Sequence, residues 1–167
     1  MEWRSEDVRV RIPGTLVPDT PDTFTSNQGW NLAEAGQQLK PIISELTSLG
    51  IRVSLFMDPD PEQIHQAKEI GAARIELYTE PYAAAFQTGP VEPVFEQYAL
   101  AAQTAQDLDL GVNPGHDLNL ENLAKFCTIP NILEVSIGHA LIADALDIGL
   151  SAAVKAYLQI LNGDQRE

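Results

Sequence analysis

The feature that most constrains this chain is the regular alternation of short β-rich runs with longer helix-patterned ones. Five runs predict strands, at residues 14–17, 52–57, 74–79, 111–113 and 133–137. The amphipathic segments that follow each run predict helices, at residues 32–49, 61–70, 91–108, 120–126 and 140–161. Strands and helices in strict turn are typical of a parallel sheet with crossover helices, so the sequence predicts an α/β fold.

Several helix boundaries carry recognisable chemistry. Gly50 and Gly71 are expected to end the first two helices, because glycine readily takes the left-handed conformation found there. Asp60, which precedes a proline, is expected to cap the second helix, with Gln63 completing a capping box. Pro41 lies inside the first helix and is expected to kink it.

An alternating chain can form an open doubly wound sheet or a closed barrel. The glycine-rich fingerprint of a dinucleotide-binding sheet does not follow the first predicted strand. Polar residues instead recur at the strand ends, where a barrel has its catalytic mouth: Asp19, Asp58, Glu76, Thr79, His116 and His139. A complete barrel needs about eight βα units and about 250 residues, so either the sheet stays open or the chain is a fragment.

The composition limits the classes of partner. Ten basic and 24 acidic residues leave a formal net charge of −14, with the acids spread along the chain. Such a surface repels nucleic acid and anionic membranes. No apolar run approaches the roughly 20 residues of a membrane span, and the single cysteine, Cys127, excludes an internal disulfide. We expect a cytoplasmic protein without nucleic-acid or membrane partners.

Two of the three histidines close predicted strands inside glycine-flanked loops, VNPGHDL with His116 and VSIGHAL with His139. His65 lies within a predicted helix, where an exposed imidazole is the simpler interpretation. Gly138 and His139 enter the last helix and form a plausible phosphate nest, although a Gly-His pair also occurs as a plain turn. An imidazole donates or accepts a proton near neutral pH, so His116 is the best acid–base candidate.

Other chemistry is less well supported. Glu76 lies in the strand RIELYT, where a carboxylate facing a barrel interior is costly unless it is paired or functional. Outward solvation or a structural salt bridge is the alternative. Together with His116, His139 and Asp58 it could supply metal ligands, but the spacing matches no short metal motif, so no metal is predicted. Cys127 does not end a strand, and no Gly-x-Ser-x-Gly elbow occurs.

Five segments carry a family resemblance: LVPDTPDTFTSNQGW, RVSLFMDPDPEQI, GAARIELYTEPYA, LGVNPGHDLNLENL and LEVSIGHALIADAL. In order and spacing they resemble the second half of the pyridoxine 5'-phosphate synthase family, over nearly the whole chain after Pro13. The resemblance implies a partial TIM (β/α)8 barrel of about the last five βα units. Residues 1–167 would be one incomplete domain, with residues 1–13 outside its core.

The resemblance also implies a reaction. The family condenses 1-deoxy-D-xylulose 5-phosphate with 3-amino-2-oxopropyl phosphate and releases pyridoxine 5'-phosphate, phosphate and water. Neither a metal nor an organic cofactor is expected, and a full-length chain is expected to form a homo-oligomer. The partners implied for this chain are therefore small phosphate esters: a sugar phosphate and an amino-ketone phosphate.

Site residues follow from the motif match. His116 takes the place of a catalytic histidine, and Glu76 that of a glutamate which stabilises the transition state. Thr25, in FTSNQGW, matches a residue that contacts the deoxyxylulose phosphate. The pair that holds phosphate is matched by Gly138 and His139, and the position beside the catalytic histidine, where the amino-ketone binds, by Asp117.

The chain departs from the family pattern at three points. Glu80 stands in TEPYA where the family usually has TGPYA, and it adds negative charge near the expected mouth. Pro114 replaces a residue that is commonly alanine, which stiffens the approach to the next glycine. The family's N-terminal Asn-x-Asp-His motif, His-x-Arg motif and strand-borne glutamate have no counterpart in these residues, so the chain alone is expected to lack two of three catalytic groups.

Two alternatives from other classes stay open. One is a non-catalytic phosphate-binding or assembly module, and the other is a different sugar-phosphate barrel enzyme of the isomerase or aldolase type. A Schiff-base aldolase is disfavoured because the lysines fall within predicted helices and not at strand ends: Lys40, Lys68, Lys125 and Lys155.

Overall fold

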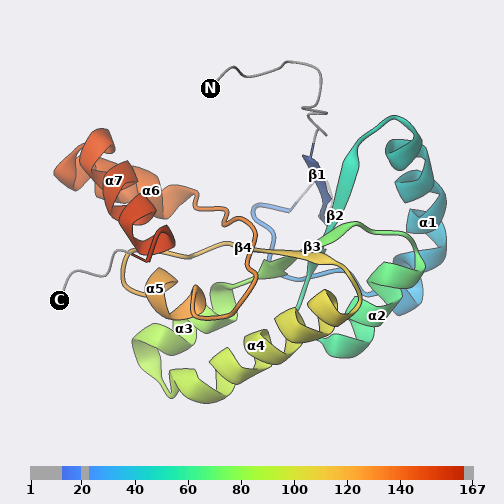
Figure 1. Ribbon diagram of the computed structural model, residues 1–167, viewed down its shortest axis with the longest axis horizontal. Coiled ribbons are helices and arrows are strands. Elements are labelled where there is room, and N and C mark those ends of the chain that lie inside the picture. The colour runs from blue at the N-terminus through green and yellow to red at the C-terminus, as the bar shows by residue number, and fades with distance from the viewer. Residues whose placement is uncertain (1–12, 20–22, 164–167) are drawn as a thin grey trace, which may run out of the picture.

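A computed structural model describes residues 13–19 and 23–163 (Figure 1). Four parallel strands form one sheet in chain order: β1 (Pro13–Leu16), β2 (Arg52–Met57), β3 (Arg74–Tyr78) and β4 (Gly111–Gly115). The helices are α1 (Leu32–Ser48), α2 (Pro61–Glu69), α3 (Glu80–Thr88), α4 (Val91–Asp107), α5 (Leu123–Phe126), α6 (His139–Ile148) and α7 (Leu150–Leu161). The predicted α/β class is confirmed. Of the N-terminal segment 1–13, only Pro13 lies within the described residues.

One face of the sheet is covered by a row of helices. Figure 1 shows α1, α2 and α4 following one another along this face. Alternate strand residues point into the layer, and Leu55, Ile75 and Leu77 are fully buried there. Ile64 from α2 and Tyr98 from α4 complete the same apolar core. Burying each such side chain contributes about 1.5–3 kcal/mol, so this layer stabilises the fold strongly.

The opposite face of the sheet carries most of the polar strand residues, together with the buried Phe56 ring. Glu76 and Asn113 are neighbours in the parallel register and point away from the helices. The Arg74 guanidinium donates to the Asn113 side-chain oxygen (2.8 Å) and pairs with Glu134 (3.2 Å), which accepts in turn from the Asn113 amide (2.8 Å). Ser54 on β2 is buried beside this network. Polar side chains at alternate strand positions therefore face the side of the sheet that the helices leave uncovered.

The predicted fifth strand at 133–137 is wrong as a regular element. The segment meets β4 only at two isolated parallel bridges, Val112 with Ile132 and Gly115 with Ser136. The Ser136 N–H still donates to the Pro114 carbonyl (2.9 Å), so the segment continues the sheet irregularly. A strand needs continuous pairing, and here nothing in the described residues pairs with the outer edge of the segment.

The predicted single helix 140–161 is also wrong. Gly149 has φ 85, in the left-handed region, and it ends α6 and precedes α7. The chain reverses there, and Figure 1 shows α6 and α7 packed as a pair away from the row of α1, α2 and α4. The apolar pattern continues through the glycine on both sides, which is why the break was missed.

Helix α3 was not predicted, and other boundaries moved. Its sequence EPYAAAFQT has a proline in the first turn and three alanines, a start signal that was available. β4 continues beyond the predicted 111–113 to Gly115, and β3 stops at Tyr78, one residue early. The helix predicted at 120–126 is shortened to α5.

The local signals at helix ends mostly hold. Gly50 and Gly71 have φ 81 and 95, directly after α1 and α2. Asp60 caps α2, because its carboxylate accepts from the Glu62 and Gln63 N–H groups at 2.9 and 3.4 Å. The capping box is wrong: the Gln63 side chain accepts from the Leu32 N–H (2.7 Å) and so joins α2 to the start of α1.

Pro41 lies on the exposed side of α1, and the helix continues through it as one element. Within the described residues, no helix combines the length and apolarity needed to cross a membrane. Among those same residues, no group of three or more His, Cys, Asp or Glu side chains is arranged to hold a metal ion.

Candidate active site

A cavity of about 720 Å³ opens beside the C-terminal ends of β3 and β4 and the start of α6. All six residues predicted as site residues line it: Thr25, Glu76, His116, Asp117, Gly138 and His139. They come from four separate parts of the chain, and the parallel sheet brings them together because the carboxyl ends of parallel strands share one edge.

His116 directly follows β4 and has an unusual backbone. Its φ is 76 and that of Asp117 is 57, both in the left-handed region that non-glycine residues rarely adopt. The half-buried imidazole packs against the rings of Phe56 (4.8 Å between centroids) and Tyr78 (5.6 Å). These contacts hold the ring beside the cavity, where it is able to reach a bound molecule.

Glu76 points away from the helices and into the cavity. The Thr15 hydroxyl donates to its carboxylate (2.8 Å), which is half-buried. The carboxylate lies so close to Gly115 that a β-carbon at that position would overlap it. Any larger residue at position 115 would displace the Glu76 carboxylate from this place. The carboxylate lines the cavity and does not point outward into solvent.

Gly138 and His139 form the entrance to α6. His139 is the first residue of the helix, and the Gly138 carbonyl accepts from the Leu141 N–H (3.1 Å). The first N–H groups of a helix lack partners within the helix and carry partial positive charge, so this end of the cavity favours an anion. A β-carbon at position 138 would meet no atom within 4 Å, so the glycine leaves open space there.

Asp117 and His139, which both line the cavity, are in direct contact. The Asp117 carboxylate lies 3.0 Å from the His139 Nε2, and the two side chains are 33% and 79% exposed. An exposed pair of this kind contributes little to stability, about 0–1 kcal/mol. Its side chains are therefore free to rearrange around a ligand at small cost.

The electrostatics of the cavity are predominantly negative. Glu76, Glu80 and Asp117 supply carboxylates, and among the described residues no lysine or arginine lines it. Burial raises the pKa of the Tyr78 phenol, and the nearby carboxylates of Glu80, Asp117 and Asp58 raise it further. An anionic ligand here depends on backbone N–H groups and imidazoles, or on groups from outside the described residues.

Several lining residues were not predicted. Tyr78 was detectable, because it lies two positions after Glu76 on the same face of β3. Ser26 and Ser136 carried no signal in the sequence, since a serine in a loop is ordinary. Thr25 is exposed in the loop before α1, beside Ser26, whose hydroxyl donates to Asp19.

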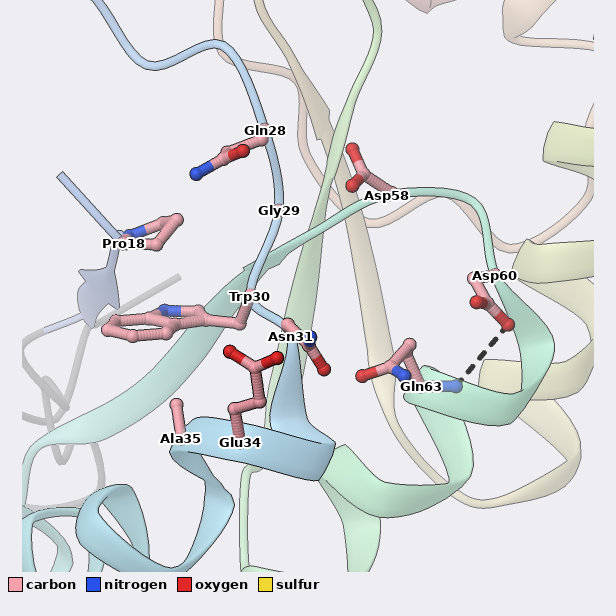
Figure 2. Close-up of a pocket in the computed structure, with 10 residues that line it drawn as sticks. All are labelled: Pro18, Gln28, Gly29, Trp30, Asn31, Glu34, Ala35, Asp58, Asp60 and Gln63. Carbon is pink, nitrogen blue, oxygen red and sulfur yellow. Dashed lines mark hydrogen bonds between the residues drawn. The ribbon is translucent and has the colours of Figure 1, made fainter.

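A second cavity, of about 560 Å³, lies where the loop before α1 meets the end of β2 (Figure 2). Gly29 packs so closely on the chain at Asp58 that a β-carbon would overlap the backbone. The Trp30 indole N–H donates to the Leu16 carbonyl (2.8 Å), and Figure 2 shows Asp60 bound to the Gln63 N–H. These polar groups hold loops and helices together, and no predicted site residue lines this cavity.

Residues 10–163 match the family model described as pyridoxal phosphate biosynthesis protein PdxJ. The chain belongs to this family. The expected resemblance to pyridoxine 5'-phosphate synthases is thereby confirmed, since relatives with that name match most of the chain at about half identity.

Three such relatives show the extent of the match. A pyridoxine 5'-phosphate synthase of Albidiferax ferrireducens is 51% identical over 148 residues, 88% of this chain and 59% of the relative. One from Xanthomonas campestris pv. campestris is 49% identical over 150 residues, 89% of this chain and 59% of the relative. One from Parabacteroides distasonis is 50% identical over 149 residues, 89% and 62%. The chain thus spans about three-fifths of the length of these PdxJ family members.

Among solved structures, the chain is similar to one in the Amycolatopsis orientalis BexX/CysO complex. The TM-score is 0.45 with 14% identity, over 78% of this chain and 53% of that chain. This likeness is too low to indicate a shared fold.

Proposed function

We propose that the cavity is part of the active site of a pyridoxine 5'-phosphate synthase. The observation that carries this proposal is that all six residues expected from the family motifs line a single cavity in a chain of the PdxJ family. The relatives at about half identity bear the synthase name. The four strands, the irregular segment from Ile132 to Ser136 and the helices then represent about the last five βα units of a (β/α)8 barrel.

Three structural features support a barrel. The strands are parallel and in chain order, as in a barrel wall. The helices α1, α2 and α4 cover one face, and the polar residues occupy the other, which would become the interior. The irregular segment from Ile132 to Ser136 lies next to β4, on the side away from β3. Further strands of a barrel could therefore pair with β1 at one edge of the sheet and with this segment at the other.

The proposed reaction is the condensation of 1-deoxy-D-xylulose 5-phosphate with 3-amino-2-oxopropyl phosphate, giving pyridoxine 5'-phosphate, phosphate and water. His116 transfers protons, because its imidazole lies at the cavity wall and is held by two aromatic rings. Glu76 stabilises positive charge that develops in the transition state, from a fixed position beside Gly115. Thr25, on the opposite loop, contacts the sugar phosphate.

The phosphate of the second substrate binds at the entrance to α6. Gly138 permits close approach of the backbone, and His139 and the helix N-terminus supply donors and partial positive charge. Asp117 binds the amino-ketone, whose ammonium group its carboxylate attracts. No metal or organic cofactor takes part in this proposal.

The family motifs that these 167 residues lack supply the remaining catalytic groups, so we propose that the chain alone does not complete the reaction. The four lysines lie in α1, α2, α5 and α7, and none lines the cavity, which disfavours a Schiff-base aldolase. The completed protein is proposed to be a cytoplasmic homo-oligomer.

The test is reconstitution. The 167-residue chain is combined with a polypeptide corresponding to the N-terminal part of the Albidiferax ferrireducens relative, which is proposed to carry the motifs that these residues lack. Formation of pyridoxine 5'-phosphate from the two substrates is then followed by fluorescence. Turnover in the mixture and none with either part alone is expected. Phosphate binding without turnover in a well-formed complex would favour a non-catalytic phosphate-binding module, and turnover of another sugar phosphate alone would favour a different barrel enzyme.

A further inference from the structure

Thr79 is a buried polar residue at the junction between β3 and α3. Its exposed fraction is 0%, and its N–H donates to the Gly115 carbonyl (3.0 Å). Its hydroxyl lies within hydrogen-bonding distance of two carbonyls, those of Gly115 (2.6 Å) and His116. Thr79, directly after β3, thus binds two consecutive carbonyls at the end of β4, with its one hydroxyl proton shared between them.

The direction of this hydroxyl is unusual for its position. Thr79 is the N-cap residue of α3, and a threonine there normally accepts a hydrogen bond from the first turn of its own helix. Here it makes no such cap, and the hydroxyl faces the loop after β4. The helix start does not explain the residue, whereas the neighbouring loop does.

That loop has the least favourable backbone of the site. His116 and Asp117 are consecutive non-glycine residues with φ 76 and 57. Such conformations are unfavourable for non-glycine residues and persist only where the surroundings fix them. The His116 carbonyl belongs to the peptide that joins the two residues. A donor on that carbonyl therefore fixes the direction of both side chains.

We propose that Thr79 is a positioning residue for His116 and Asp117. By anchoring the turn it keeps the His116 imidazole against Phe56 and Tyr78 and the Asp117 carboxylate beside His139. The proposal rests on the proposed function only for its catalytic consequence. The placement of the imidazole is measurable without any turnover.

The variants separate the hydroxyl from the shape of the side chain. Thr79→Val keeps the branched shape and removes the donor, Thr79→Ser keeps the donor, and Thr79→Ala is the smaller donor-free variant. Thr104→Val is the matched control, because the Thr104 hydroxyl also donates to a carbonyl, that of Leu100 (2.9 Å), but on α4.

The first readout is the rate at which diethyl pyrocarbonate modifies each histidine, followed by mass spectrometry. In the parent, His116 is half-buried and should react more slowly than His65 and His139, which are exposed. Thr79→Val and Thr79→Ala should raise the His116 rate several-fold, and Thr79→Ser and Thr104→Val should leave it unchanged. Alkylation of the half-buried Cys127 thiol reports global unfolding and should not change in any variant.

Unchanged His116 modification in both donor-free variants would overturn the proposal. A parallel rise at Cys127 would also overturn it, because the hydroxyl would then support the whole fold and not the turn. The second readout is turnover of the reconstituted synthase, where Thr79→Val should lower kcat by about 10²-fold with a smaller change in KM, and Thr79→Ser should restore it. Altered labelling with no turnover even in the parent would reject the proposed function and leave the positioning role intact. An unaltered kcat in Thr79→Val, with turnover in the parent, would reject the positioning role and leave the proposed function intact.

Discussion

The two sides of the sheet differ in how completely the described residues satisfy them. On the helix-covered side, Leu55, Ile64 and Ile75 have no exposed surface, and the apolar pattern of the strands meets that of the helices. On the other side, polar residues face an open cavity, and α6 and α7 lie beyond it. The sequence predicts elements on both sides of the sheet, but only the helix-covered side is buried from solvent. We call the helix-covered side the sealed side and the other the open side.

The α6 and α7 pair shows the difference most clearly. α6 has no buried residue, and Leu146 on it is 86% exposed. α7 buries only Ala153 and Tyr157 and leaves Leu150 59% exposed. Helices with an apolar face of this extent normally pack that face against a protein core or a partner surface. The comparison indicates that the first side is the well-packed part of the chain and that the second side leaves apolar surface exposed.

The largest expected contrast is between catalysis and stability. In the reconstituted synthase, His116→Asn should lower turnover by about 10²- to 10⁴-fold, the usual contribution of general acid–base catalysis. The free energy of unfolding should change little, because the half-buried side chain lies on the open side. Steady-state kinetics and chemical unfolding measure the two quantities. Turnover within a few-fold of the parent would remove His116 from the chemistry.

The second contrast is between two apolar residues on helices. Ile64→Ala, on the sealed side, should lower the free energy of unfolding by about 2–5 kcal/mol, because it leaves a cavity. Leu146→Ala should change it by less than about 0.5 kcal/mol in the chain alone, since the side chain is exposed. Pulse proteolysis at low protein concentration gives both values. Equal costs at the two positions would contradict the division into two sides.

Self-association should depend on the open side. The 167-residue chain is expected to associate at micromolar concentration through the apolar surface of α6 and α7 and the unpaired sheet edges. Leu146→Lys should weaken this association, because each leucine buried between chains contributes about 1.5–3 kcal/mol. Gln38→Lys, at an exposed position on α1, changes the net charge by the same amount and is the matched control. A parent that stays monomeric in light scattering would show that the exposed surface is harmless.

The fourth contrast concerns phosphate binding at the start of α6. Gly138→Val should weaken binding of inorganic phosphate about tenfold, the value of one hydrogen bond to a charged group. Gly89→Val is the matched control, since a β-carbon meets no atom within 4 Å at either glycine. His116→Asn should bind nearly as well as the parent. Calorimetric titration decides, and equal affinity in Gly138→Val would exclude the nest.

The sequence predicts the sealed side better than the open one, for a physical reason. Alternating apolar strands and amphipathic helices produce their own core, so 52–57 was predicted residue for residue and α1 and α4 to within one residue. The break at Gly149 and the irregular segment after Ile132 depend on tertiary contacts that periodicity does not report. Hydrophobic periodicity predicts a strand or helix well where that element packs against a neighbouring element of the same chain.

The site shows the same division. His116 and His139 were found because each follows a glycine at the end of a predicted strand, and Glu76 because it is a carboxylate within a strand. The family motifs supplied Thr25 and Asp117. Thr79 was noted only as a polar strand end. Its role depends on a hydroxyl that crosses from β3 to the loop after β4, and no spacing in the chain encodes that contact.

The smallest contrast is in the response to alkaline pH. Burial raises the pKa of Tyr157, and its hydrogen bond to Asp144, which joins α7 to α6 (2.6 Å), raises it further. An unfolded tyrosine ionises near pH 10, whereas the folded one stays protonated. Its contribution is therefore fully present below about pH 10 and is lost as the pH rises beyond it, by up to about 1.4 kcal/mol per pH unit.

Tyr157→Phe removes this dependence together with one hydrogen bond, which costs about 0.5–1.5 kcal/mol at neutral pH. Between about pH 10 and pH 11, chemical unfolding should show a smaller loss of stability in Tyr157→Phe than in the parent. Tyr98→Phe is the counterpart on the sealed side, where burial also raises the tyrosine pKa and the hydroxyl donates to the Tyr78 carbonyl (2.6 Å). If α6 and α7 unfold together with the sheet, both variants reduce the pH-dependent loss of stability in a single unfolding transition.

If only Tyr98→Phe reduces that loss, α6 and α7 unfold separately from the sealed side. Stability in Tyr157→Phe could instead fall as steeply with pH as in the parent, in a single transition shared by both helices and the sheet. That result would show that the Tyr157 phenol ionises normally.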